Sequence, residues 1–537
     1  MTRATSPPAQ VIVGLDAGTT GVKAVAFGLD APWRRVVVRE YPLLQPQPGW
    51  QVQDPGTIVA ASVDALAECV AAVGAAEVVA IALSAAMHGL VGLDVAMRTV
   101  TPLITWADSR AQDEARSLRT SGQAADLHRR TGVPVHPMSP LTKLMWMSRN
   151  DPTTCASARW WVGLKDYLLW SLTGTLATEL SSASGSGLLD MATRSWSPAA
   201  VDLAGIAVDQ LPPIEPTTAT LPLAAEPAAR VGLSAGLPVV LGAADGPLGN
   251  LGTGAITPGV AGLSLGTSGA IRAAVDRPAV DDGGTLFCYA LTDTTWVVGG
   301  AVSNGGIVLR WAGRSLAPDI QHVAGDTDVD RALLRLAEEV PAGSAGLVVL
   351  PYLVAERAPL WDPDLPGVVL GLRYEHTRAH LIRAALEGVC LQLRAVLDAL
   401  DRLQRVQTIR ATGGTLRAPL WRQVLAATLD RPLSLVGDAE GTALGAAALG
   451  LHALGREDRL ADAVARLRDP DESPADEVEP DPALVATYER VRRSVPEHLT
   501  ALAAVGALFS DDHERHDDEG LASGPSTPAS LRPSDRE

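Results

Sequence analysis

The chain has 537 residues, a formal net charge of −17 at pH 7 and an isoelectric point near 5.1. This length favours two large domains, and a content of 47% hydrophobic and 20% charged residues is typical of a globular chain rather than a disordered one. A strongly acidic chain repels nucleic acid and anionic membranes, so neither is an expected partner.

The cysteines and the N-terminal segment indicate the cellular compartment of the protein. The 4 cysteines, Cys69, Cys155, Cys288 and Cys390, are widely scattered without CxxC or metal-ligand spacing, which predicts free thiols in a reducing compartment. The opening segment MTRATSPPAQ lacks the apolar core of a signal peptide, and no apolar run reaches the ~20 residues of a membrane span. We expect a cytoplasmic protein, and its oligomeric state is left open, a homodimer included.

In the first half of the chain, apolar stretches alternate with helical patterns. Strands are expected within 11–38 and at 78–84, 90–94 and 238–242, and helices at 56–75, 110–131, 139–150 and 160–173.

The same alternation restarts in the second half. Strands are expected at 260–274, 296–300, 347–351 and 407–411, and helices at 303–313, 327–340, 377–402, 418–430, 441–453 and 482–505, with an acidic, Pro-rich surface loop at 469–481. This mixture predicts two α/β domains, 11–255 and 256–505. The segments 1–10 and 506–537 are expected to be disordered, the second as an acidic tail.

One phrase occurs twice in the chain. It reads LDAGTTG at 15–21 and LSLGTSG at 263–269, each time between two apolar stretches, which is typical of a strand, a tight turn and a second strand. Glycines allow backbone N–H groups to close on phosphate oxygens, and hydroxyls add donors. Two such turns indicate related halves facing each other across a polyphosphate, although each copy alone is equally consistent with an ordinary hairpin. The first copy is not a Walker A loop, because GxxxxGK[ST] is absent.

Two aspartates stand at strand ends near these turns. Asp16 is placed to hold Mg²⁺, directly or through water, whereas Ser264 occupies the equivalent position of the second copy. Asp245 follows a buried strand, where it either orients and deprotonates a hydroxyl or caps the next helix.

Three further turns carry groups suited to ligands. Met87-His88 and the segment from Trp106 to Arg110 offer hydrogen-bonding groups for a polyhydroxylated substrate, with a satisfied histidine and a capping aspartate as the alternatives. Gly413-Gly414, directly after a strand, allows a base or ribose to approach the backbone, or simply starts a helix.

Together these segments resemble the FGGY family of carbohydrate kinases over roughly residues 10–505. Two signatures carry the resemblance: MSPLTKLMWM at 138–147, and GVVLGL at 367–372 followed by HLIRAALE at 380–387. The family's fold consists of two actin/hexokinase-like (ribonuclease H-like) domains with a nucleotide cleft between them. The resemblance therefore implies a phosphotransferase that uses ATP and Mg²⁺.

The resemblance also implies a role for each matching position. Asp245 is similar to the family's catalytic base and also contacts the acceptor, and Asp16 is similar to its Mg²⁺-linked acid. The other implied positions are Gly18, Thr19, Thr20, Lys23, Gly266 and Thr267 for phosphate, Gly305 and Gly306 for the nucleotide cleft, Gly413 and Gly414 for adenosine, and Met87, His88, Trp106, Asp108 and Arg110 for the sugar.

Within the family, the phrases SAAMH, ITWADSR, HPMSPL, GTSGAIR and NGGIVLRW most resemble the bacterial gluconokinase branch. This implies phosphorylation of D-gluconate to 6-phospho-D-gluconate, with His88 and Arg110 as candidates to bind the carboxylate. Ala86 stands where xylulokinases carry Gln, and the phrase Leu365-Pro366-Gly367 departs from the family, which often has Arg before this Gly. A xylulokinase, another pentulose or polyol kinase, and a non-catalytic sugar sensor remain the alternatives.

Overall fold

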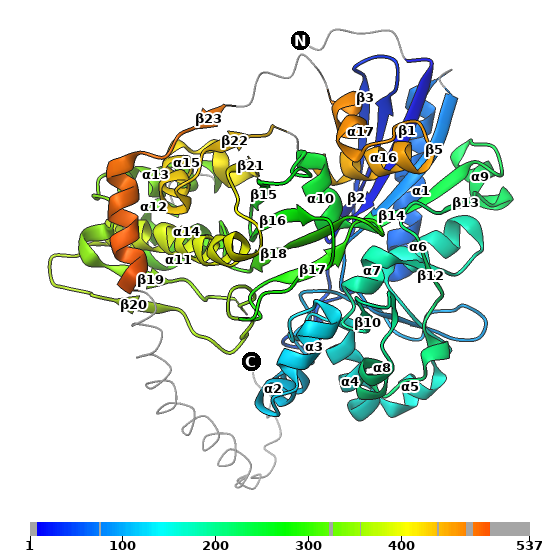
Figure 1. Ribbon diagram of the computed structural model, residues 1–537, viewed down its shortest axis with the longest axis horizontal. Helices are drawn as coiled ribbons and strands as arrows, with labels where there is room; N and C mark the ends of the chain where they lie inside the picture. The colour runs from blue at the N-terminus through cyan, green and yellow to red at the C-terminus, as the bar shows by residue number, and fades with distance from the viewer. Residues whose placement is uncertain are drawn as a thin grey trace, which may run out of the picture.

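Two β-sheets with matching strand orders organise the computed structural model, which describes residues 8–74, 77–321, 326–354, 356–437, 440–468 and 476–494. The first sheet has the order β13 (Thr220–Pro222), β14 (Pro238–Ala244), β5 (Glu77–Ala85), β1 (Gln10–Ala17), β2 (Gly21–Gly28) and β3 (Arg34–Glu40). The second has the order β17 (Phe287–Ala290), β18 (Trp296–Val302), β16 (Gly269–Val275), β15 (Val260–Leu265), β21 (Thr408–Thr412), β22 (Leu433–Leu435) and β23 (Glu477–Val478). Figure 1 shows them as the cores of two lobes.

The repeated phrase occupies the same place in both sheets. β1 and β2 form an antiparallel hairpin, and β1 runs parallel to β5, just as β15 pairs with β16 and runs parallel to β21. β5 lies parallel to β14, as β21 does to β22. The prediction of two related α/β halves is therefore confirmed, and each Gly/Thr turn is the tip of a central hairpin.

The first sheet is covered on both faces. Helix α1 (Pro55–Val73) packs through Ile58 and Leu66 on one face, in a core that includes Val22 of β2. Helices α16 (Gly441–Ala453) and α17 (Leu460–Leu467) cover the other face. Figure 1 shows these two orange helices against the blue strands. Residues 441–467 thus lie on the first lobe although they come between β22 and β23 of the second sheet in sequence, so a single boundary near residue 255 does not describe the spatial lobes.

Among the described residues, α1 alone has the length and composition that a membrane-spanning helix needs. This helix has 19 residues, so it nearly reaches the length of about 20 residues that a membrane span needs and that we expected no apolar run of the chain to have. Its buried face is part of the first lobe's core, and Asp64 and Glu68 interrupt its other face. This packing is that of a core helix of a folded domain.

A very close approach joins α10 (Asp245–Thr253) to α16. A Cβ atom added at Gly252 would lie 1.7 Å from the Gly441 carbonyl oxygen, and one added at Gly445 would lie 2.1 Å from that of Leu248. Only glycine fits at either position, so the two helix backbones are in direct contact. Because α10 begins at Asp245, this contact fixes where that carboxylate stands.

The second lobe is built on the long helix α14 (Arg378–Leu403), which packs against β16 and β18. Around it lie α11 (Ile307–Leu316), α12 (Pro318–Gln321), α13 (Asp326–Glu338), α15 (Pro419–Leu429), a two-stranded sheet of β19 (Val348–Leu350) and β20 (Val368–Leu370), and a helix over 482–494. Buried side chains of β15 to β18, α14 and α15 form one continuous core.

Smaller elements, all but β4 of which follow β5 in sequence, form a cap on the first lobe. The helices are α2 (Gln112–Thr120), α3 (Ala124–Thr131), α4 (Pro140–Asn150), α5 (Pro152–Ser157), α6 (Leu164–Thr173), α7 (Leu180–Ser184), α8 (Pro198–Ala204) and α9 (Ala225–Val231). The short strands are β4 (Val52–Gln53), β6 (Val91–Leu93), β7 (Leu103–Ile104), β8 (Trp160–Val162), β9 (Thr178–Glu179), β10 (Leu189–Asp190), β11 (Ser195–Trp196) and β12 (Ile214–Glu215).

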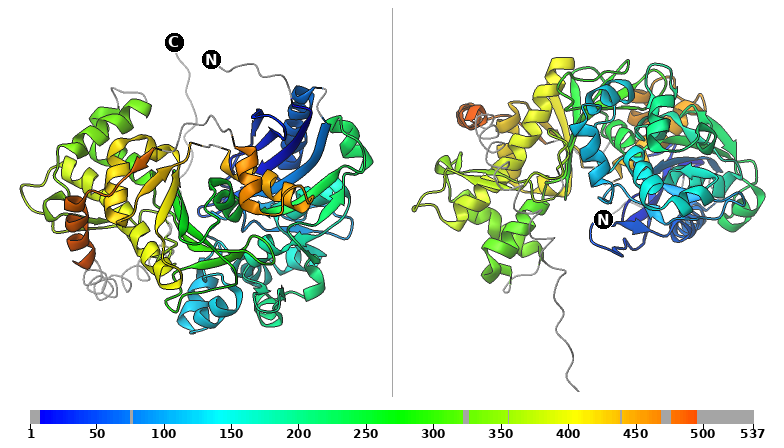
Figure 2. Two further views of the ribbon diagram at one scale, coloured as in Figure 1. Left: turned by 45° about the horizontal axis from the view of Figure 1, so that its top comes forward. Right: turned by 90° about the horizontal axis from the view of Figure 1, so that it is seen from below.

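The cap touches the second lobe directly. Ser184 Oγ accepts a hydrogen bond from the Ala290 amide at 2.9 Å, and the His128 ring donates to the Leu286 carbonyl at 2.6 Å. Arg116 of α2 pairs with Asp364 at 3.1 Å. The turned views in Figure 2 show the two lobes meeting on this side.

Most expected elements are present, and the differences have local causes. The helix expected over 110–131 is two helices, because Gly122, with φ of 80°, separates α2 from α3. Residues 160–162 are a strand before α6, and the helix expected from residue 303 starts at Ile307 after a turn. Several expectations fall on residues outside those that the structure describes. They are the disordered ends at 1–7 and 506–537, most of the surface loop at 469–475, and the last part of the final helix at 495–505.

We predict that Gly252→Ala lowers the melting temperature by several degrees, because the new methyl group forces α10 away from the Gly441 carbonyl and such overpacking costs about 1–3 kcal/mol. Differential scanning fluorimetry measures the shift. Gly56→Ala in α1, where the added Cβ would have no contact closer than 3.5 Å, is the matched control and should be neutral or stabilising. Equal melting temperatures for the two variants would contradict the close contact.

Candidate active site

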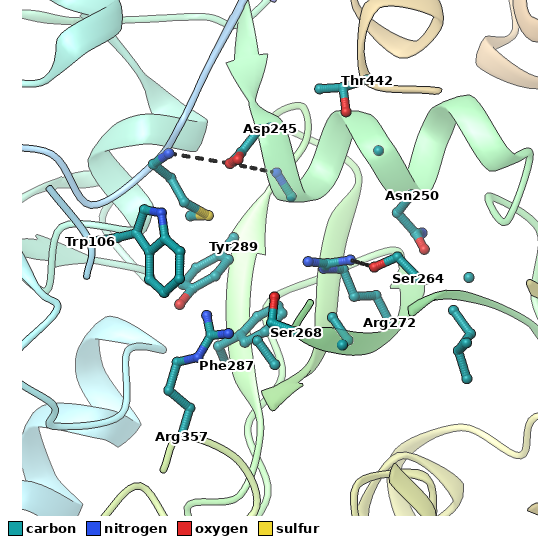
Figure 3. Close-up of a pocket in the computed structure, with 18 of the residues that line it drawn as sticks. Trp106, Asp245, Asn250, Ser264, Ser268, Arg272, Phe287, Tyr289, Arg357 and Thr442 are labelled. Atoms are coloured by element: carbon teal, nitrogen blue, oxygen red, sulfur yellow. Dashed lines mark hydrogen bonds between the residues drawn. The ribbon is translucent and has the colours of Figure 1, made fainter. Parts of the chain in front are cut away.

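A cavity of about 440 Å³ lies between the two lobes and draws its walls from both. Of the residues singled out in the sequence, it is lined by Thr19, Met87, His88, Trp106, Asp245 and Gly413. The second lobe adds Ser264, Ser268, Arg272, Phe287, Tyr289 and Arg357. Figure 3 shows the carboxylate of Asp245 and the ring of Trp106 facing this space opposite the arginines.

Asp245 stands at the first residue of α10, directly after the buried strand β14. It is not a helix cap: the N-cap position belongs to Ala244. Its Oδ1 accepts hydrogen bonds from the Met87 amide at 3.2 Å and the Gly246 amide at 2.9 Å. Burial raises the pKa of Asp245, and the charge of Arg272 offsets part of that rise. The carboxylate is therefore oriented by backbone amides and lies at the cavity wall.

Asp16 lies near the end of β1, which β5 separates from β14. In register it faces Lys23 on β2 and Ser84 on β5, and the Ser84 hydroxyl donates to Asp16 Oδ1 at 2.8 Å. Burial raises the pKa of Asp16 to about 6, and the nearby charge of Asp245 adds to the rise. Asp16 itself is not among the residues that line the cavity.

Within the part of the chain that the structure describes, no cluster of three or more His, Cys, Asp or Glu side chains could hold a metal ion. Asp16 provides one carboxylate instead. Mg²⁺ commonly takes one or two carboxylates and completes its octahedron with water and phosphate oxygens, so a single acid fits a metal that arrives with a phosphate ligand.

The first turn is braced by hydrogen bonds. The Gly18 amide donates to the Gly21 carbonyl at 3.0 Å, and the Tyr41 hydroxyl donates to the Gly18 carbonyl at 2.5 Å. The Trp106 indole N–H donates to Thr19 Oγ1 at 2.9 Å, which ties the turn to the cap. Thr19 thus touches both the turn and the cavity.

The second turn is stabilised by hydrogen bonds from residues 305–310. The amides of Gly305 and Gly306 donate to the carbonyls of Thr267 and Gly266 at 3.1 and 2.7 Å. The Arg310 guanidinium donates to Thr267 Oγ1 at 3.0 Å. These glycines therefore support the turn rather than form a cavity wall.

Gly413 packs against Leu265, the last residue of β15 before the second turn. It has a φ of 124°, and an added Cβ would lie 2.2 Å from the Leu265 carbonyl oxygen. A side chain cannot be accommodated here, so a ligand in the cavity meets bare backbone.

His88 faces the cavity as a neutral group. Its φ is 65°, and its Nδ1 lies 2.8 Å from the Gly185 carbonyl, so Nδ1 is the protonated nitrogen and Nε2 is left as an acceptor. Burial and the nearby charge of Lys143 lower the pKa of His88 to about 3. A histidine that stays uncharged is unsuited to pair with a carboxylate, which was one of its expected roles.

Lys143, on α4, joins the two loops of the acceptor side. Its ammonium donates to the carbonyls of His88 and Thr105 at 2.6 and 2.7 Å, and to that of Ile104 at 3.4 Å. The side chain is fully buried, and burial lowers its pKa to about 7. The ammonium positions both His88 and the residue preceding Trp106.

Asp108 and Arg110 form a buried ion pair with each other, with two contacts of 2.8 Å. Asp108 also accepts from the Gln51 amide at 2.8 Å, and the Arg110 guanidinium stacks 3.7 Å from the Trp50 ring centroid. Neither residue lines the cavity. The pair holds the loop that carries Trp106 and leaves no charge for a ligand.

The remaining predicted residues do not line the cavity. These are Gly18, Thr20, Lys23, Gly266, Thr267, Gly305, Gly306 and Gly414.

The sequence reasoning missed Arg272 and Arg357 as site residues. Arg272 is the charged residue of the otherwise apolar strand β16. This pattern could have marked Arg272 as a site residue, because a cation buried on a strand normally has a partner or a ligand. Arg357 follows a short strand in an irregular segment, and nothing in the local pattern marks it.

Comparison with known proteins agrees with this geometry. The FGGY family of carbohydrate kinases matches as its N-terminal domain over residues 11–252 and its C-terminal domain over 261–454. The gluconokinases of Bacillus licheniformis and Bacillus subtilis are 38% identical over 455 residues, which is 83% of this chain and 88% of theirs. The Bacillus subtilis xylulose kinase is 29% identical over 445 residues, covering 82% of this chain and 87% of its own.

Solved structures give the same picture. Gluconate kinase from Lactobacillus acidophilus has a TM-score of 0.86 at 33% identity, covering 93% of this chain and 99% of its own. A ligand-bound xylulose kinase from the same organism has a TM-score of 0.85 at 33% identity, covering 93% and 100%. The fold is the two-domain, actin/hexokinase-like fold of these enzymes, and the chain belongs to the FGGY family of carbohydrate kinases.

Proposed function

We propose that this kinase transfers the γ-phosphoryl group of ATP to the terminal hydroxyl of D-gluconate and releases 6-phospho-D-gluconate. The observation that carries the proposal is the place of Asp245, which faces a cavity lined by Thr19 of the first turn and Ser268 of the second. The gluconokinases of two Bacillus species, at 38% identity, support gluconate as the acceptor. We further propose that the enzyme works in the cytoplasm, where ATP and sugar acids are available.

ATP fits the half of the cavity near the second turn. Phosphate oxygens can accept from the turn backbones and from the hydroxyls of Thr19 and Ser268, while the bare backbone at Gly413 admits the adenosine. Mg²⁺, held through Asp16 and the phosphates, would neutralise charge that develops on the transferring group. A chain of net charge −17 repels an anionic nucleotide at long range, so the binding of ATP depends on these hydrogen-bond donors within the cavity.

Asp245 supplies the acceptor chemistry. Its Oδ1 is turned by the Met87 and Gly246 amides, which leaves Oδ2 for a substrate hydroxyl. In a largely dissociative phosphoryl transfer, the base orients the hydroxyl and takes its proton late. Two lobes that meet around the acceptor also exclude water, which would otherwise compete as the nucleophile.

The main alternative acceptor is a pentulose, because xylulose kinases match nearly as much of the chain at 29% identity. A coupled assay of ADP release with D-gluconate, D-xylulose, glycerol and other sugar acids separates these options. The proposal expects the highest kcat/KM with D-gluconate. Preference for a pentulose would contradict it, and ATP binding without turnover on any acceptor would favour a sugar sensor.

We predict that Asp245→Asn lowers kcat by about 10²–10⁴-fold while the dissociation constant of ATP changes little, because the amide cannot accept the hydroxyl proton. Steady-state kinetics and calorimetric titration with ATP measure the two quantities. Retention of most of kcat would show that Asp245 is not the base.

The pH profile gives a second prediction. Because burial raises the pKa of both Asp245 and Asp16, kcat/KM should fall as the pH drops through those raised values and the carboxylates become protonated. His88 adds no step near neutral pH, since its pKa is about 3. An acid limb no higher than that of an ordinary aspartate would contradict the burial argument.

We predict that Lys143→Met raises the KM for the acceptor at least tenfold and leaves the KM for ATP nearly unchanged. The variant removes the donor shared by the His88 and Thr105 carbonyls, and each buried, unpaired carbonyl costs about 1–3 kcal/mol. Lys143→Arg keeps the charge and should recover part of the loss. A parallel rise in both KM values would indicate general destabilisation instead.

A further inference from the structure

Arg357 brings a positive charge to the cavity that no described carboxylate neutralises by an ion pair. Its Nε donates to Ser303 Oγ and its Nη2 to the Val302 carbonyl, both at 3.1 Å. The guanidinium lies 5.0 Å from the centroid of the Trp106 ring. These neutral contacts fix the plane of the group, and the described residues accept no hydrogen bond from its Nη1.

The adjacent carboxylate is occupied elsewhere. Glu356 is fully buried; its Oε2 accepts from Asn304 Nδ2 at 2.8 Å, and its Oε1 accepts from the Arg357 backbone amide at 2.8 Å. The charge of Glu356 still acts on Arg357, more strongly than that of Asp245, but neither carboxylate forms an ion pair with the guanidinium. Arg357 is partly buried and its guanidinium donates only to neutral groups, so it is suited to pair with an anion that enters the cavity.

Tyr289 supplies a second unsatisfied group at the same place. Its side chain is buried against Phe287, with ring centroids 4.3 Å apart, and against the edge of His88 at 5.6 Å. Its hydroxyl is buried and has no hydrogen-bond partner. Burial raises the pKa of Tyr289, so the hydroxyl stays protonated and needs an acceptor. In the view of Figure 3 the hydroxyl and the Arg357 guanidinium lie on the opposite side of the cavity from Asp245, and the charge of Arg357 acts on Tyr289.

The second arginine of the cavity lies between Asp245 and the second turn. Arg272 contacts Ser264 Oγ at 3.5 Å, next to the second turn, and its charge acts on Asp245 and on Tyr289. Arg357 instead lies 5.0 Å from the centroid of the Trp106 ring, on the acceptor side. Of the two cations, Arg357 is therefore the one that contacts the ring of Trp106.

We propose that Arg357 and Tyr289 bind the carboxylate of an aldonate, at the end of the acceptor remote from the hydroxyl that receives the phosphoryl group. This inference rests on the proposed function and names the two residues that recognise the carboxylate of its substrate. The guanidinium donates to the carboxylate oxygens and neutralises them, and the tyrosine hydroxyl gives one more hydrogen bond. The neutral His88 then contacts a hydroxyl of the sugar chain, and Arg110, paired with Asp108, takes no part.

The test compares D-gluconate with D-gluconamide, its neutral isostere, and with D-xylulose. In wild type, kcat/KM should be highest for D-gluconate. Arg357→Gln should lower that value by about 10²-fold, the range found when one partner of a buried charge pair is truncated. With D-gluconamide the same variant should lose less than about fivefold, because a neutral amide does not need the charge. Tyr289→Phe should cost roughly tenfold with D-gluconate and little with D-gluconamide.

Controls separate recognition from folding and from long-range electrostatics. Arg314→Gln removes an equal charge from an exposed site on α11 and should change neither substrate's kinetics. Melting temperature and ADP affinity report whether each variant is folded. If Arg357→Gln does not fold, Arg357→Lys keeps the charge but loses the planar fork, and is predicted to retain an intermediate preference for D-gluconate.

The outcomes distinguish this proposal from the function on which it rests. A wild-type enzyme that prefers D-xylulose overturns both. A wild-type enzyme that prefers D-gluconate, together with an Arg357→Gln variant that keeps the full preference over D-gluconamide, leaves the function standing and overturns the carboxylate site. An equal loss with both substrates in a folded variant also overturns it.

Discussion

The contact between α10 and α16 is the constraint on which the site depends. Gly252 and Gly445 let the two helix backbones touch, and α16 in turn rests on β1 and β5 of the first sheet. Because Asp245 is the first residue of α10, its carboxylate is fixed relative to the strands that carry Asp16 and the first turn. The Met87 amide then sets the direction in which the carboxylate points. Placement of the reacting groups is most of what phosphoryl transfer asks of a protein.

The two halves repeat each other in form and differ in chemistry. Asp16 pairs in register with Ser84, and Ser264 pairs in the same way with Thr412. One turn therefore has an acid beside it and the other a hydroxyl, so a metal ion has a carboxylate on one side only. The second half differs again in carrying Arg272 and Arg357 into the cavity. An acidic chain thus presents local positive charge where a triphosphate and a sugar acid are expected to meet.

Local patterns predicted the hairpins, the turns and Asp245, because each depends on residues near in sequence. The position of residues 441–467 on the first lobe was not predictable, since an Ala- and Gly-rich helix carries no sign of which sheet it covers. Asp108 and Arg110 were expected at the sugar, yet they neutralise each other, and a sequence shows charges without their partners. Arg357 was missed for the converse reason: its importance lies in having no ion-pair partner among the described residues, which only the fold reveals.

We propose that both lobes assemble one phosphoryl-transfer site around Asp245, and a crystal structure with D-gluconate and a non-hydrolysable ATP analogue is the sharpest test of that arrangement. The C6 hydroxyl should lie within hydrogen-bond reach of Asp245, about 2.6–3.2 Å, and in line with a γ-phosphate that touches both Gly/Thr turns. Gluconate bound with none of its hydroxyls near Asp245, or a nucleotide whose γ-phosphate lies outside the cavity, would rule this arrangement out.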